Sequence, residues 1–412
     1  MCNVKRLILL ASMIGAAGLS GMNLIRPYQI LLRPPKLEDS RMQLYAIGQF
    51  GFGSKAFGIE GDAVNPLQIY ECNQNALTML NGFSACSPIG QLSARINAES
   101  DCARGRFTPC ANFHVDGAAE FGLRFFFEHY ISFVVYFPYY AMRLDDVVWQ
   151  DLTGCTSIQD ARTHAYLTDC LSENICTLGG LDIGGWKRHG PGDTTLSLEW
   201  IQDFAQNREF LRNVTLNSRL GMTVPTALKE DEDKILAFSF GNDRAIGIVF
   251  ALGIDLFLGS YVKAGLDVQL MHTFGNTRCR RIKTDVLQTE LFLLQKASAF
   301  RDFGLTQQFS LYWQFYNVGG ASCEIAYQFY KRGQDELSLT SNEFSSQIAN
   351  SSLNLIGYTT HDLFLILSYD FERHMSDTAR WAPYAAAFVD IPFNGKRSVV
   401  ARTAGFTLGV NF

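Results

Sequence analysis

The sequence of 412 residues predicts an all-β fold, an antiparallel barrel of about 12 strands. Three observations predict it. Apolar and polar residues alternate along one segment after another, the number of such segments is even, and the connections between them are alternately short and long. Because successive side chains of a strand point to opposite faces, this alternation gives each strand one apolar and one polar face.

The last segment, 398–412, shows the alternation most clearly. Val400, Ala404, Phe406, Leu408, Val410 and Phe412 share one face, and Thr403, Gly405, Thr407, Gly409 and Asn411 share the other. In a soluble sandwich the apolar face would turn inward to a core, whereas in a membrane barrel it faces lipid and the polar face lines a lumen. The expected strands are 42–53, 113–127, 130–144, 193–205, 208–224, 243–257, 260–275, 302–316, 320–333, 356–371, 380–393 and 398–412.

The connections favour the membrane barrel. The short ones are 128–129, 206–207, 258–259 and 317–319, with one of middling length at 372–379. The long ones are 54–112, 145–192, 225–242, 276–301 and 334–355, and the one exception to the alternation is a tight Asn394-Gly395-Lys396 hairpin on the long-loop side. Outer-membrane barrels have tight periplasmic turns and long outward loops. The even count places both termini on the short-turn side.

Composition excludes several other classes. Charged residues are 18% of the chain, where a soluble domain carries about a quarter, and aromatic residues are 13%, with 32 Phe. Mean hydropathy is only +0.02. After the first 20 residues no apolar run reaches the roughly 18 residues of a membrane helix. The net charge of −5 and the lack of a basic patch argue against nucleic acid.

The N-terminus predicts export. Lys5 and Arg6 precede a short apolar stretch rich in small residues, which is typical of a signal peptide over residues 1–20. The alternative is an N-terminal membrane anchor, although the stretch is shorter than a membrane span. We expect 21–41 to be a periplasmic segment and 42–412 to form the barrel with its long outer loops at 54–112 and 145–192.

The C-terminus resembles that of transmembrane β-barrels from the outer membranes of diderm bacteria. In that class the last strand carries a polar residue, a Gly, two spaced hydrophobic residues and a terminal Phe, here Thr403, Gly405, Leu408, Val410 and Phe412. The resemblance implies insertion by the barrel assembly machinery and a bacterial outer-membrane location. It is a resemblance to a porin-like architecture and points to no specific family.

Eight of the nine cysteines after residue 20 fall in predicted outer loops: Cys72, Cys86, Cys102, Cys110, Cys155, Cys170, Cys176 and Cys279. In an oxidising compartment this distribution predicts disulfides that staple the long loops. A zinc site is the alternative, but there is no Cys-x-x-Cys pair. We therefore predict no metal site and no cofactor.

The polar faces of the strands give the candidate lumen lining. It comprises Asp116, Glu120, Arg124, Glu199, Asp203, Arg219, Asp255, Lys263, Asp267, Glu324, Arg332, Asp370 and Asp390. Acids outnumber bases by nine to four, so an open lumen should favour cations. The alternative is that these groups pair across the barrel and close it.

The function predicted is passive or selective diffusion of small solutes through a porin-like channel. The alternative is a surface structural or adhesion protein with a plugged barrel. No Ser–His–acid set is evident, so we do not expect an enzyme. The expected partners are outer-membrane lipid and lipopolysaccharide, with the charged run 229–234 as a solvated loop tip that contacts lipopolysaccharide through divalent cations. The sequence carries no prediction of oligomeric state.

Overall fold

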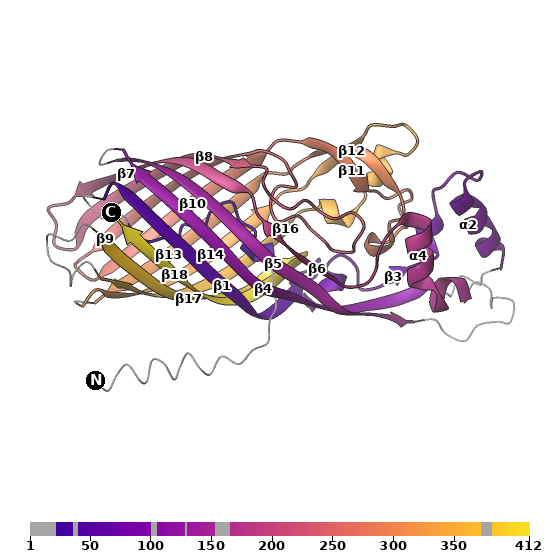
Figure 1. Ribbon diagram of the computed structural model, residues 1–412, viewed down its shortest axis with the longest axis horizontal. Helices are drawn as coiled ribbons and strands as arrows, with labels where there is room; N and C mark the ends of the chain where they lie inside the picture. Colours follow the sequence, from indigo (N-terminus) through magenta and orange to yellow (C-terminus); the bar gives the residue numbers. More distant parts are fainter. Residues whose placement is uncertain are drawn as a thin grey trace.

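The computed structural model describes residues 22–35, 40–99, 105–127, 130–152, 165–317, 319–371 and 381–412. Its main sheet has 15 strands, and twelve of them form a closed ring once the short additions β2, β3 and β6 are set aside. Every neighbouring pair in the ring is antiparallel, and β1 closes it by pairing with both β18 and β4. Figure 1 shows the strands tilted across the barrel wall. The predicted all-β antiparallel barrel is confirmed.

The ring strands follow the predicted order along the chain. They are β1 (Met42–Phe57), β4 (Arg106–Phe126), β5 (Ile131–Asp151), β7 (Thr194–Ala205), β8 (Leu211–Val224), β9 (Gly247–Leu258), β10 (Val262–Thr273), β13 (Thr306–Tyr316), β14 (Ala321–Arg332), β16 (Tyr358–Asp370), β17 (Ala382–Lys396) and β18 (Ser398–Asn411). The short turns lie at the end of the barrel that holds the C-terminus, and the long connections lie at the opposite end (Figure 1).

Side chains alternate across the wall as the sequence predicts. On β4, Phe121 is 54% exposed on the outside, while its neighbour Glu120 is buried inside the ring. On β8, Leu220 is 58% exposed outside and Arg219 is buried inside. An apolar outer face of this kind suits lipid, because charged groups on that face of a barrel are costly.

The long connections build a folded cap at the outer end of the barrel (Figure 1). The cap contains β2 (Ala63–Val64), β3 (Gln74–Asn75), β6 (Trp186–Pro191), helices α2 (Pro88–Glu99), α4 (Leu171–Gly179) and α5 (Ser346–Ala349), and a second sheet of β11 (Asn276–Arg281), β12 (Lys296–Asp302) and β15 (Glu336–Leu339). No helix among the described residues has the length and apolarity to cross a membrane.

The cap is held by packing and ion pairs, which corrects the predicted disulfides. Phe113 stacks on Phe238 with ring centroids 5.4 Å apart, and Trp186 and Phe292 belong to the same buried cluster. The cysteines of the described residues, namely Cys72, Cys86, Cys110, Cys170, Cys176, Cys279 and Cys323, are free thiols. Cys102, Cys155 and the predicted signal peptide lie outside the described residues. A core of this size orders long loops without covalent staples.

Candidate functional site in the barrel lumen

Residues 22–35, which we call the plug, run through the interior of the barrel. Their hydrogen-bond partners come from strands all around the ring: β1, β5, β7, β14, β16, β17 and β18. A segment that touches opposite sides of a closed ring must lie inside it. The prediction of a periplasmic segment over 21–41 is therefore wrong for residues 22–35. Met22 lies toward the cap, and Pro35 lies near β1 at the short-turn end.

Two arginines attach the plug to the wall. Arg26 pairs with Asp362 on β16, and their side chains are 2% and 0% exposed. Arg33 reaches Glu199 on β7 at 2.5 Å, and Arg124 of β4 contacts the same carboxylate at 2.7 Å. Buried ion pairs such as these are geometrically specific, and losing one partner is costly because it leaves an uncompensated charge.

Hydrogen bonds and an aromatic contact also hold the plug against the wall. Asn23 donates to Asp390 on β17 at 3.0 Å, and Gln29 donates to Gln328 on β14 at 3.0 Å. The ring of Tyr28 packs edge-on against Tyr136 of β5, with centroids 5.3 Å apart. All of these contacts between the plug and the wall are non-covalent.

Cavities lie on both sides of the plug. On the short-turn side is a vestibule of about 680 Å³, lined by Arg33 and Pro34 of the plug and by inward-facing strand residues. On the cap side is an outer cavity of about 180 Å³, lined in part by Met22, and a smaller space of about 70 Å³ lies beside Arg26. The plug therefore lies between a vestibule inside the barrel wall and the cavities beneath the cap.

The structure places twelve of the thirteen predicted lumen residues on the inner side of the wall or around its cavities. Arg124, Asp203, Asp255, Lys263, Glu324 and Asp370 line the vestibule, Glu120, Glu199, Arg219, Asp267 and Asp390 are buried at the level of the plug, and Arg332 lines the outer cavity. Several pair with one another: Arg219 contacts Asp267 at 2.7 Å and Lys263 contacts Asp255 at 3.9 Å. Their role in conduction stays a prediction.

Asp116 is the exception and corrects the prediction. A register shift between Val115 and Gly117 in the β4–β5 pairing marks a bulge, and past it the side chain of Asp116 is exposed. There it pairs with Arg143 at 3.0 Å and with Lys187 at 3.4 Å. A one-residue bulge reverses which face each following side chain occupies, so simple alternation misplaced it.

No protein-family model and no curated protein matches the sequence. Among solved structures, the chain is similar to the COG4313 outer membrane channel from Pseudomonas putida F1, at 11% identity and a TM-score of 0.48, over 93% of this chain and 99% of that one. It is also similar to the Pseudomonas putida toluene transporter TodX, at 7% identity and a TM-score of 0.31, over 96% and 94%. It is similar as well to a Pseudomonas aeruginosa FadL homologue, at 9% identity and a TM-score of 0.27, over 90% of each chain. These similarities are too remote to carry an inference about function.

The class is decided by the architecture itself. Only helices and closed barrels satisfy every backbone group within lipid, and this ring closes through β1 with an apolar outside and a polar inside. The fold is that of a bacterial outer-membrane β-barrel.

Within this barrel, sequence reasoning missed Arg26, Arg33 and Asp362. Asp362 lies eight residues before Asp370 on the same strand. Because side chains an even number of residues apart share a face of a strand, the alternation already predicted an inward position for Asp362. The arginines had no such signal, because residues 22–35 form no regular element beyond one 3₁₀ turn, η1 (Met22–Leu24). The terminal residues Thr403, Gly405, Leu408, Val410 and Phe412 lie on or just after β18, which pairs with β1 and β17; their recognition by the assembly machinery stays a prediction.

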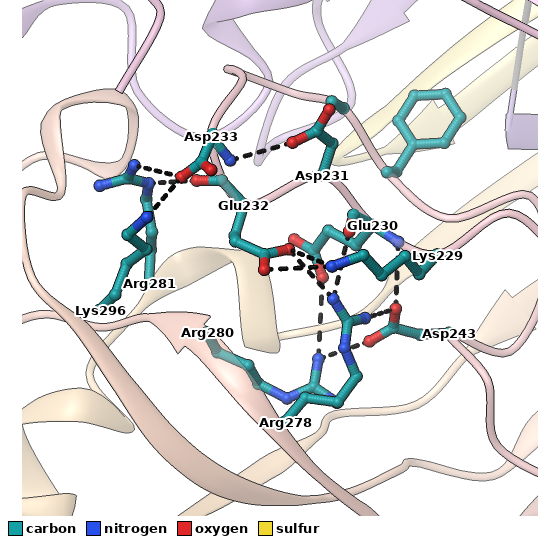
Figure 2. A network of polar contacts seen from close by, with 12 residues as sticks. Lys229, Glu230, Asp231, Glu232, Asp233, Asp243, Arg278, Arg280, Arg281 and Lys296 are labelled. Carbon is teal, nitrogen blue, oxygen red and sulfur yellow. Dashed lines mark hydrogen bonds and ion pairs between the residues drawn. The ribbon is translucent and has the colours of Figure 1, made fainter. Parts of the chain in front are cut away.

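The charged run 229–234 is not the solvated loop tip that the sequence predicted. Glu232 accepts an ion pair from Arg278 at 3.2 Å, and Asp233 contacts Lys296 at 2.7 Å. Figure 2 shows the run folded against the arginines of β11. Hydrogen bonding from Lys296 lowers the pKa of Asp233 below its ordinary value. The run is thus tied into the cap by ion pairs, although side chains such as Asp233 remain partly exposed.

Proposed function

We propose that this protein is a channel of the bacterial outer membrane for small solutes, closed by its own plug in the conformation described. The observation that carries the proposal is the position of residues 22–35 between a vestibule inside the barrel wall and a cavity beneath the cap. A barrel filled by wall side chains alone would leave no such spaces, whereas a separate segment can move while the wall stays intact. Assembly machinery, lipid and lipopolysaccharide are the partners that this location implies.

The contacts of the plug favour a removable closure. Its two ion pairs end on side chains of the wall, as do its hydrogen bonds to Asp390 and Gln328, and Asn23 also bonds to the backbone N–H and carbonyl groups of Ala401. None of these contacts belongs to the strand pairing that holds the barrel together. The wall strands pair through their own backbone ladders. Removing the plug should therefore open the lumen without opening the barrel.

A chain lacking residues 22–35 tests the proposal. In planar bilayers it should conduct continuously, whereas the full chain should be mostly closed. A synthetic peptide with the sequence of residues 22–35, added on the short-turn side, should reduce the current, and a scrambled peptide of the same composition should not. Heat-modifiable migration on a gel checks that the shortened barrel is folded. A folded variant without current would refute the channel.

The second candidate is a surface structural or adhesion protein with a permanently closed barrel. The large cap with its own buried core favours it, because the cap presents a folded surface outside the membrane. The same experiment separates the two functions. A structural protein should show no current even without the plug, whereas a channel should conduct.

A further inference from the structure

The outer cavity is lined by an unusual concentration of arginines. The guanidinium groups of Arg280, Arg301 and Arg332 lie 6.0, 5.3 and 5.3 Å from the centre of the Phe303 ring. All three residues line the cavity of about 180 Å³. Positive charges this close together repel one another unless carboxylates lie between them. Whether the cavity can bind a further anion therefore depends on how tightly the existing carboxylates contact these arginines.

On one side of the cavity, Asp335 neutralises part of this charge. It contacts Arg301 at 2.6 Å and Arg332 at 3.3 Å, and it also accepts a hydrogen bond from the backbone of Gly304. One carboxylate therefore serves two guanidinium groups.

On the other side, two arginines of β11 share Asp243. Arg280 lies 2.5 Å from it, and Arg278 contacts its other oxygen; Figure 2 shows both reaching the same carboxylate. Arg278 also contacts Glu232 at 3.2 Å. Asp243, Glu232 and Asp335 are thus three closely bound carboxylates for four guanidinium groups.

Glu230 is the fourth carboxylate, and it is held loosely. Its Oε2 lies 3.8 Å from Arg280 and 3.5 Å from Arg301, and its side chain is 41% exposed. Arg280 is only 6% exposed, and its Nε has no hydrogen-bond partner in the part of the chain that the structure describes. Arg280 and Arg301 therefore face one anion position that Glu230 fills at long range.

We propose that the outer cavity is a binding site for a small organic monoanion with an apolar body, whose anionic group replaces the carboxylate of Glu230. The lining also includes apolar side chains, among them Leu291, Leu293, Leu337 and Leu355. Its volume is comparable to that of an engineered cavity of about 150 Å³ that binds benzene. A carboxylate on a benzene-sized body matches both the charge and the volume. This site does not depend on the channel proposal.

Benzoate and its neutral analogue benzyl alcohol are the probes, titrated calorimetrically into the full-length protein in detergent at low salt. Benzoate should bind and benzyl alcohol should not. Glu230→Gln removes the competing internal anion, so benzoate should bind about tenfold more tightly. Glu343→Gln is the matched control. It removes one carboxylate from an exposed position of the cap that does not line the cavity, so affinity should stay unchanged.

Arg301→Gln should abolish benzoate binding in protein that keeps its heat-modifiable migration. Unchanged affinity in Glu230→Gln would overturn the proposal without requiring the arginine variant to fold. Equal binding of benzoate and benzyl alcohol would overturn it as well, since the site would then be merely apolar. Because binding is measured without conductance, its failure is distinct from failure of the channel.

Discussion

Replacing Arg26 by Gln should open the lumen more than any other single change in the plug. Arg26 and Asp362 are both almost fully buried, and no second described cation contacts Asp362. Removing one partner of a buried ion pair costs about 3–5 kcal/mol. The cost falls on the closed state, because water can reach Asp362 once the plug has left. Since each 1.4 kcal/mol is about tenfold, the open-to-closed ratio should rise by roughly 10² to 4 × 10³.

Arg33→Gln provides a comparison for the rise in the open-to-closed ratio expected from Arg26→Gln. Glu199 keeps Arg124 at 2.7 Å when Arg33 is lost, so no bare charge is left behind. The loss is then that of a charge-assisted hydrogen bond, about 1.5–3 kcal/mol, and the open-to-closed ratio should rise less than in Arg26→Gln. Arg41→Gln is the control, since it removes the same charge from an exposed position before β1.

The assay is single-channel recording of each folded variant under identical voltage and salt. The expected order of open probability is Arg26→Gln, then Arg33→Gln, then Arg41→Gln, with the last equal to the unaltered chain. If Arg26→Gln opens no more often than Arg41→Gln, then either the plug does not close the lumen or its buried ion pair does not hold it there, and the argument from burial fails.

Three further predictions concern the cap and the open lumen. Thiol labelling of unreduced protein, read by mass spectrometry, should modify Cys72, Cys170 and Cys279, whereas blocked thiols would restore the disulfide hypothesis. Burial would raise the pKa of Asp335, but the neighbouring Arg332 and Arg301 lower this pKa overall, so the ionised carboxylate stabilises the cap at any pH above the pKa of Asp335 in the unfolded chain. This stabilisation should fade as the pH falls from about 5 toward 2. Proteolysis of the cap loops should then become faster, with no change in its rate between about pH 6 and 8. The barrel without its plug should prefer cations in a salt gradient, and a reversal potential of the opposite sign would contradict this.

The strands could be predicted from sequence because lipid and water impose opposite demands on neighbouring residues. That signal weakens where the strands leave the membrane. β4 begins at Arg106 and β5 ends at Asp151, well beyond the predicted 113 and 144, because outer side chains there, such as Asn112 and Asp145, face water. The alternation of apolar and polar residues is then lost even though the backbone pairing continues.

The cysteines and the plug escaped prediction for different reasons. Cysteine number and compartment say that disulfides are possible, but only geometry decides whether two sulfurs meet, and a buried core can replace them. The plug has no periodic pattern of apolar and polar residues, because its side chains contact partners all around the ring rather than on one face. Its residues Arg26 and Arg33 become interpretable only when Asp362 and Glu199 are in place around them.

The corrected positions of Asp116, Asp362 and the plug change the charge that is expected in the lumen. Excluding Asp116 and adding Asp362 leaves nine carboxylates on the inner faces of the described ring strands, namely Glu120, Glu199, Asp203, Asp255, Asp267, Glu324, Asp362, Asp370 and Asp390, so the predicted nine-to-four ratio survives with one member exchanged. That ratio counts the wall alone and so describes a barrel without its plug. In the closed state Arg26 and Arg33 add two positive charges and cover two of the acids. Departure of the plug therefore removes two positive charges from the lumen and uncovers Asp362, while Glu199 keeps its contact with Arg124, so cation preference should belong to the open state.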